Sequence, residues 1–163
     1  QTHFVKNWAN NGVDHMNFYA TPASVNGVQL SAGDEVAIFD GTACVGVTLL
    51  TGALNQGDYL SIIASKDDET TGTKDGYTPG NSYSVKVWDA SEGQEISNLS
   101  VETIGDQVFV VGGSATVKLA IDDNPPPPSS SVPVYTPGKL AFLLLLTAIM
   151  GAVILRKRKF NLK

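Results

Sequence analysis

Residues 35–50 read EVAIFDGTACVGVTLL, two apolar runs separated by the dipeptide Asp40-Gly41. Val, Ile and Phe are enriched in β-strands, and two-residue hairpin turns favour Asp-Gly. The stretch therefore predicts a β-hairpin with strands at residues 35–39 and 43–50.

The remainder of the first 121 residues repeats this pattern of short apolar or alternating runs between Gly, Asn and Asp turns, with almost no helical periodicity. The other predicted strands are residues 16–20, 28–30, 59–65, 82–88, 101–104, 107–111 and 115–121. Nine short strands at this spacing are typical of an all-β fold, an antiparallel β-sandwich or jelly roll. We therefore expect one β-sandwich domain over residues 1–121.

Charge divides the chain into an acidic body and a basic end. All sixteen acidic residues lie between Asp14 and Asp123, whereas six basic residues and no acidic one occur from Lys139 onward. Nucleic-acid binding needs clustered Lys and Arg, and residues 1–138 hold only five lysines. We expect no nucleic-acid partner.

Residues 139–163 predict a membrane anchor with a basic cytoplasmic tail. Residues 140–155 carry no charge, and as a helix they span about 24 Å of a hydrocarbon core that is ~30 Å thick. Lys139 and Arg156 extend the span by snorkelling. A buried core helix is the alternative, but the run RKRK at residues 156–159 gives the positive-inside signal. We expect a single-pass transmembrane α-helix in the lipid bilayer, with the body periplasmic or at the cell surface.

The predicted anchor carries small side chains on one side, and these are Ala148, Gly151 and Ala152. In lipid, such residues let helix backbones approach closely. The pattern predicts helix packing against another membrane protein.

Two more segments complete the predicted topology. Residues 122–138 contain four consecutive prolines and then three serines, which predicts a semi-rigid stalk of at most about 50 Å. The sequence begins at Gln1 without Met, and export of the body predicts a cleaved signal peptide.

The sequence lacks common catalytic motifs. It has no Gly-x-Ser-x-Gly nucleophile motif and no glycine-rich phosphate loop. His3 and His15 lack the spacing of a zinc site, and we expect both to be structural. Cys44, the single cysteine, lies among apolar strand residues, which predicts a buried, unreactive thiol. We expect no enzymatic activity.

An acidic loop between two predicted strands, residues 66–76, is a candidate calcium site because hard oxygen ligands suit Ca²⁺. Its spacing does not match an EF-hand, and a solvated loop whose polar side chains cap turns is the alternative. The candidate ligands are Asp67, Asp68, Glu69 and Asp75. A weaker second group comprises Asp34, Glu35 and Asp40. Calcium is the only cofactor that the sequence suggests.

Aromatic residues raise a glycan-binding hypothesis. Trp8, Tyr77 and Trp88, with Tyr83, could form a stacking platform on a jelly roll, but core or edge packing is the interpretation that we favour for each of them.

A series of short motifs in residues 1–95 resembles a domain that recurs in secreted and surface proteins of Bacteroidota. The motifs are His3-Phe4, Trp8, His15-Met16-Asn17, Gly33-Asp34-Glu35-Val36, Phe39-Asp40-Gly41, Cys44-Val45-Gly46, Leu50-Thr51-Gly52, Ile62-Ile63-Ala64-Ser65, Asp67-Asp68, Asp75-Gly76-Tyr77, Pro79-Gly80 and Val87-Trp88-Asp89. The resemblance implies a secreted β-sandwich and no particular activity. The C-terminal end, with Val132-Pro133-Val134 before the apolar run, resembles an exosortase-type sorting signal. An ordinary stop-transfer anchor explains the same residues and is the interpretation that we favour.

These features favour an accessory or structural subunit that docks onto other proteins of a membrane or envelope complex. The alternative is a glycan-binding surface module. An exposed aromatic row would favour glycans, whereas an apolar patch or open strand edges would favour protein docking.

The charge segregation generates a topology prediction. Protease added to intact spheroplasts should digest the body and leave the basic C-terminal end intact, because only the body lies outside the membrane. Antibodies against a tag at each end would follow the two fragments. A body that resists protease until the membrane is permeabilised would contradict the predicted orientation.

Overall fold

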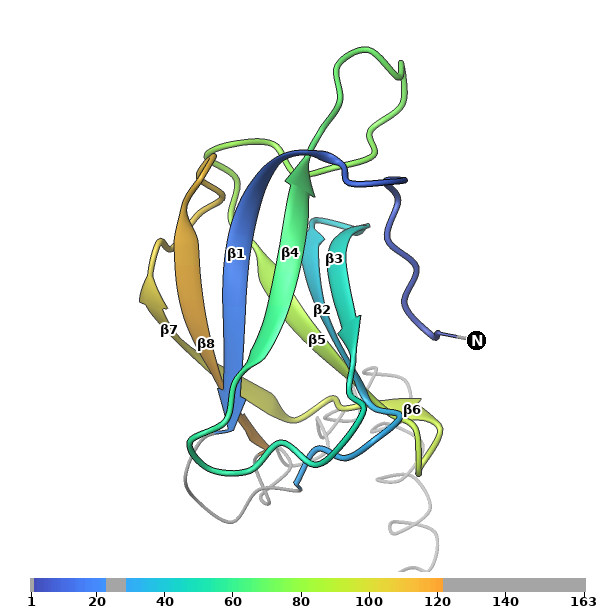
Figure 1. Cartoon of the computed structure of the whole chain (residues 1–163), viewed down its shortest axis with the longest axis vertical. Coiled ribbons are helices and arrows are strands. Elements are labelled where there is room, and N and C mark those ends of the chain that lie inside the picture. Colours follow the sequence, from blue (N-terminus) through green and yellow to red (C-terminus); the bar gives the residue numbers. More distant parts are fainter. Residues whose placement is uncertain (1, 23–28, 122–163) are drawn as a thin grey trace, which may run out of the picture. The chain divides into compact units, whose positions relative to one another are not determined.

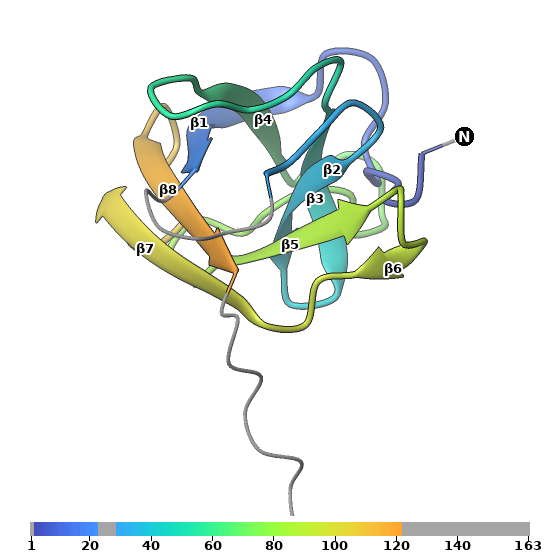
Figure 2. The same ribbon diagram turned by 90° about the horizontal axis from the view of Figure 1, so that it is seen from below.

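The computed structural model describes residues 2–22 and 29–121, which form two four-stranded β-sheets and no helix. The strands are β1 (Val13–Pro22), β2 (Glu35–Asp40), β3 (Ala43–Leu49), β4 (Leu60–Lys66), β5 (Ser84–Asp89), β6 (Gln94–Glu95), β7 (Leu99–Gly105) and β8 (Ser114–Ile121). One sheet has the order β4-β1-β8-β7 and the other β3-β2-β5-β6. Figures 1 and 2 show the two sheets face to face. The predicted all-β class is confirmed for these residues.

Most strand pairs are antiparallel, as predicted, but β1 and β8 are parallel. This corrects the fully antiparallel expectation. The pairing joins the first and last strands of the domain, so local sequence carries no signal for it.

Seven of the nine predicted strands are present, and two are not. Residues 107–111 form no strand, because Val108 makes only an isolated bridge to Ser82. Residues 29 and 30 also lie outside any strand. The predicted hairpin forms, but its pairing continues to Asp40 opposite Ala43, so Gly41 and Thr42 are the turn residues and not Asp40-Gly41.

The main core lies between the sheets and follows the period of two expected of strands. In β1, Met16, Phe18 and Ala20 point inward and are fully buried, whereas Asn17 and Tyr19 retain exposure. Burying one large apolar side chain stabilises a fold by about 1.5–3 kcal/mol. The alternation therefore fixes which face of β1 meets the core.

The two ends of the sandwich carry different segments. β1 begins where β4 ends, since Val13 pairs with Lys66, and β8 also begins near this end, since Asn17 pairs with Ser114. β8 then runs to Ile121 at the opposite end, next to the end of β1 (Figure 1). We call the end with the start of β1 and β8 the distal end. The acidic loop lies there.

Asp40, at the end of β2, holds the segment after β4 against the sandwich. Its buried carboxylate accepts hydrogen bonds from Lys74 Nζ (2.8 Å), Thr78 N (2.9 Å) and Asn81 Nδ2 (2.9 Å). Burial acts to raise the pKa of Asp40, but the three donors outweigh burial and hold this pKa below its ordinary value of 3.8. The anionic form therefore stabilises the fold.

We predict that Asp40→Asn lowers the free energy of unfolding by about 2–4 kcal/mol at pH 7, because the amide cannot pair with Lys74. The folded-state pKa is lowered, so the stabilisation by Asp40 is present above the ordinary carboxyl pKa and is lost as the pH falls through the folded value. Urea unfolding can be followed by far-UV circular dichroism for the wild type and for Asp40→Asn. The difference between their free energies of unfolding should become smaller at acidic pH.

Glu102→Gln is the control, because Glu102 is exposed and forms only a 3.4 Å surface ion pair with Lys118. We expect a change below about 0.5 kcal/mol for this variant. An Asp40→Asn protein as stable as this control at pH 7 would contradict the assigned role of Asp40.

Candidate functional site: a polar hollow at the distal end

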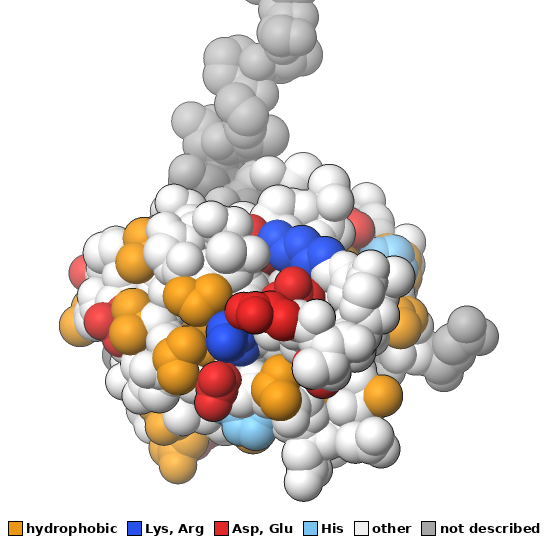
Figure 3. Space-filling model, turned by 90° about the horizontal axis from the view of Figure 1, so that it is seen from above, with side chains coloured by type: hydrophobic (Ala, Val, Ile, Leu, Met, Phe, Trp, Pro, Cys, Tyr) orange, Lys and Arg blue, Asp and Glu red, His pale blue; other side chains and the backbone are white. Residues whose placement is uncertain are grey.

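A hollow of about 340 Å³ opens at the distal end of the sandwich. One wall is the chain entering β1, residues 8–13, and the other contains Ser65 of β4 with Asp68, Thr71 and Asp75 of the acidic loop. In Figure 3, which views this end, acidic and lysine side chains lie next to one another. The hollow is therefore lined by residues of two predicted sites: Asp68 and Asp75 of the calcium loop, and Trp8 of the aromatic platform.

Trp8 supplies the aromatic part of the wall. Its indole Nε1 donates a 2.6 Å hydrogen bond to the carbonyl of Val45 in β3, which fixes the orientation of the ring. Lys6 Nζ lies 3.3 Å from the ring centroid, within the range of a cation–π contact. The indole is therefore held in place, and one of its faces already carries a cation.

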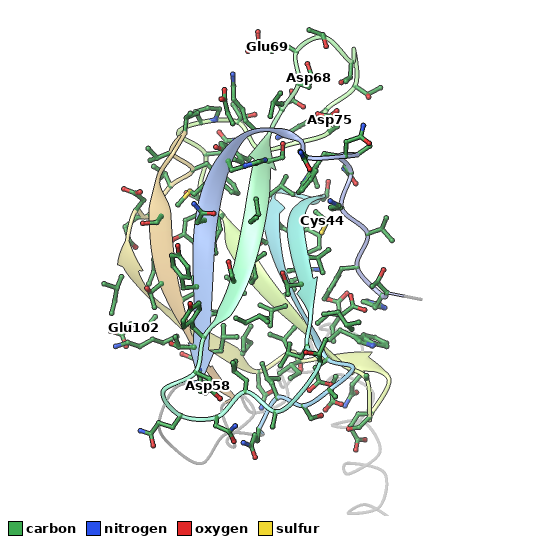
Figure 4. All side chains as sticks on the ribbon, viewed as in Figure 1. Cys44, Asp58, Asp68, Glu69, Asp75 and Glu102 are labelled. Carbon is green, nitrogen blue, oxygen red and sulfur yellow. The ribbon has the colours of Figure 1, made fainter. Side chains whose placement is uncertain are left out.

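Hydrogen bonds within the acidic loop give its carboxylates defined positions. Asp67 Oδ1 accepts from the main-chain N–H groups of Asp75 (2.7 Å) and Gly76 (3.2 Å), while Asp75 Oδ1 accepts from Asp68 N (3.0 Å). Asp68 Oδ1 accepts from the hydroxyl (2.7 Å) and the N–H (2.9 Å) of Thr70. The two limbs of the loop are thereby tied together. Figure 4 shows Asp68 and Asp75 on these limbs.

Asp68 is anionic at neutral pH. The hydrogen bonds from the hydroxyl and then from the N–H of Thr70 lower the pKa of its carboxyl, and Lys66 adds a smaller effect in the same direction. The carboxylate lines the hollow, so it gives this cavity a negative charge.

The four predicted calcium ligands do not converge. Asp67, Asp68 and Asp75 each use a carboxylate oxygen to accept main-chain N–H groups, and Glu69 is exposed beside Lys66 at 3.9 Å. Within residues 2–22 and 29–121, no group of three or more His, Cys, Asp or Glu side chains is placed to hold a metal ion. Calcium binding by this loop stays a prediction.

The second, weaker calcium group is also engaged in other contacts. Asp34 accepts from the N–H groups of Ser31 (2.8 Å) and Ala90 (2.9 Å). Glu35 accepts from the N–H groups of His3 (2.7 Å) and Phe4 (2.9 Å). With Asp40, these buried carboxylates connect distant segments of the chain.

The predicted aromatic platform does not assemble. Tyr77 is fully buried, with its ring stacked on Phe109 at 4.6 Å between centroids, so it cannot contact a glycan. Trp88 is half-buried on β5 and is stacked by the His3 ring at 3.7 Å. Tyr83 packs at the edge of the core. Of the three aromatic residues Trp8, Tyr77 and Trp88, only Trp8 lines the hollow.

Sequence reasoning missed two other groups. Tyr19 and Tyr59 meet edge-on at 5.7 Å on the outer side of the first sheet, where Tyr59 is 66% exposed. The alternation in β1, which places Met16, Phe18 and Ala20 inward, was a signal that could have located Tyr19. Asn10 and Asn11, which line the hollow, lie in a loop without such a pattern.

The expected structural roles of the histidines and of Cys44 fit their surroundings. His3 Nε2 lies 3.2 Å from Glu95 Oε1, and His15 Nε2 contacts the carbonyl of Asn11. Cys44 is buried, and this burial, with a smaller effect from Glu35, raises the pKa of the thiol to about 11.

The predicted stalk and anchor, including Ala148, Gly151 and Ala152, lie outside the described residues. Among the residues that are described, no helix is long and apolar enough to cross a membrane.

Comparisons with protein-family models, curated proteins and solved structures find no match to this chain. The proposals below therefore depend on its residues and geometry alone.

The calcium prediction is tested by thermal unfolding. If the acidic loop binds Ca²⁺ with the 10⁻⁴–10⁻³ M affinity typical of extracellular modules, 10 mM CaCl₂ should stabilise the protein by about 1.4–2.7 kcal/mol relative to EDTA. The variant Asp67→Asn/Asp75→Asn should lose this gain, while 10 mM MgCl₂ should reproduce little of it. Identical melting with CaCl₂ and with EDTA would assign the loop carboxylates to turn formation alone.

Proposed function

We propose that the chain is a non-enzymatic, membrane-anchored extracytoplasmic protein that docks onto another protein of a membrane or envelope complex through the distal hollow. The observation that carries the proposal is the junction of the Trp8 indole with the Asp68 and Asp75 carboxylates around one hollow. An indole beside two carboxylates suits a Lys or Arg side chain, which can pair with a carboxylate and stack on the ring.

The position of the hollow supports this assignment. β8 ends at Ile121, at the opposite end of the sandwich, and the predicted stalk follows from there. A site at the distal end would therefore face away from the root of the stalk. A partner within the same envelope could reach it.

The order within the site also supports recognition. The hydrogen bonds between Asp67, Asp68 and Asp75 fix the loop before a partner arrives, and a preformed site loses less conformational entropy on binding. The carboxylates stay at the surface, where they can steer a basic partner at low ionic strength.

A glycan is the second candidate for the same hollow. Sugar recognition combines an aromatic face with polar groups that hydrogen-bond to hydroxyls, and Trp8, Asn10, Asn11 and Asp75 provide both kinds of group. Lys6 already covers one face of the indole. The charge of the Asp68 and Asp75 carboxylates is what favours a basic side chain over a neutral glycan.

We predict that Asp68→Asn/Asp75→Asn reduces recovery of the partner at least about tenfold in affinity purification from detergent-solubilised membranes, because the site loses its charge. Each Asn retains the oxygen that accepts the loop hydrogen bond, so the loop should keep its shape. Quantitative mass spectrometry of the purified material measures the loss.

Glu102→Gln is the control for loss of acidic charge elsewhere, since it removes one acidic charge from β7, away from the hollow. Equal partner recovery by the loop variant and by this control would contradict docking at the hollow. A different result would favour the glycan: polysaccharide in a native gel retards the wild type but not Trp8→Ala, and no protein partner is recovered.

A further inference from the structure

The first residues of the chain form a strap, residues 2–8, which forms no strand and runs beside β3 in Figure 1. Phe4 of the strap packs against Ala37 and Phe39 of β2, on the outer face of the sheet β3-β2-β5-β6. The strap starts with His3 stacked on Trp88 of β5 and ends with Trp8 hydrogen-bonded to Val45 of β3. Because it adds no ladder of strand pairing, a small set of contacts holds it.

The central contact is the carboxylate of Glu35, the first residue of β2. Oε1 accepts the N–H of His3 at 2.7 Å, and Oε2 accepts the N–H of Phe4 at 2.9 Å. Among the described residues, the strap donates both of the hydrogen bonds to this carboxylate. Glu35 is 2% exposed. Glu35 is therefore covered and satisfied only while the strap is closed.

The strap also closes a small apolar cluster that is separate from the main core. Phe4 packs there with Ala37, Phe39 and Cys44, and its ring is edge-on to Phe39 at 5.6 Å. The main core lies on the other side of the sheet and contains none of these residues. Release of the strap would uncover this cluster and leave the contacts between the sheets in place.

The link from the strap to β1 is a turn, in which the N–H of Gly12 donates to the carbonyl of Ala9. Asn10 (φ 53°) and Gly12 (φ 64°) in this link, and Asp14 (φ 41°) at the start of β1, adopt positive φ, which is uncommon for residues other than Gly. The same link forms a wall of the distal hollow. Movement of the strap would therefore also move that wall.

We propose that residues 2–8 are a gate that opens as a unit while the sandwich stays folded, and that gate closure completes the distal hollow. The second half of this proposal depends on the proposed docking function. The first half depends only on the contacts of Glu35, Phe4 and Cys44.

Cys44 provides a natural reporter of gate opening, since it is the only thiol in the chain and lies buried beneath the strap. The full chain in mild detergent would be treated with Ellman's reagent at fixed pH, and far-UV circular dichroism would follow global unfolding in urea. In the wild type, we expect labelling without urea at a rate that stays constant until the global transition begins. Such labelling reports a local opening.

Glu35→Gln should raise the labelling rate at least about tenfold, because the amide cannot accept both strap N–H groups with the strength of a carboxylate. Its free energy of global unfolding should fall by only about 1.4 kcal/mol relative to the control Glu102→Gln, which is what a tenfold change in the opening equilibrium corresponds to. Phe4→Leu, which shortens the apolar anchor and keeps the Glu35 charge that helps to raise the pKa of the Cys44 thiol, should give a smaller increase. An increase in this variant reports opening and not a change in thiol reactivity, and it keeps the test available if Glu35→Gln does not fold. Labelling that appears only with global unfolding, in the wild type and in the folded variants, would overturn the gate.

The coupling to the hollow is tested in the purified complex. We expect slower Cys44 labelling in the complex than in the free chain, because a bound partner holds the Trp8 wall in place. A complex with unchanged labelling would overturn the coupling. Failure to recover any complex would overturn the proposed function and the coupling together, whereas labelling of the free chain would still decide whether the gate exists.

Discussion

Three carboxylates at the ends of β2, those of Asp34, Glu35 and Asp40, are shielded from water and must be satisfied by the protein itself. Each one binds a different part of the chain: Asp34 the turn after β5, Glu35 the N-terminal strap, and Asp40 the segment that includes the acidic loop. β2 is also buried along its whole length. The candidate site exists because the segments on both sides of it are attached to this one strand.

The sequence predicted the strands whose side chains alternate or whose apolar runs end at clear turns. It failed where an element depends on a partner far away in the chain. Residues 107–111 have a strand-like composition, yet only Phe109 is deeply buried, and its main chain bonds to Asn81 in an irregular segment. The parallel pairing of β1 with β8 is likewise non-local. Local propensity carries no information about either pairing.

The candidate site shows the same division. The acidic composition of the loop was visible in the sequence, and so was Trp8 as an aromatic residue of interest. The proximity of Trp8 to the loop was not visible, because it depends on contacts of the strap with strands far away in the chain, such as those with Glu35 and Val45. Tyr77 was a candidate for a glycan platform, with core packing as the favoured interpretation, and it is buried. Its N–H donates to the carbonyl of Ser65 in β4 and turns the ring into the core.

Docking through the distal end can be measured by lysine-reactive cross-linking of the intact protein in its membrane. Three lysines lie toward the distal end: Lys6 beside Trp8, Lys66 at the end of β4, and Lys74 in the acidic loop. Two others lie elsewhere on the sandwich, Lys86 on β5 and Lys118 on β8. We expect cross-links to the partner protein to form through Lys6, Lys66 and Lys74. Cross-links confined to Lys86 and Lys118 would contradict docking through the distal end.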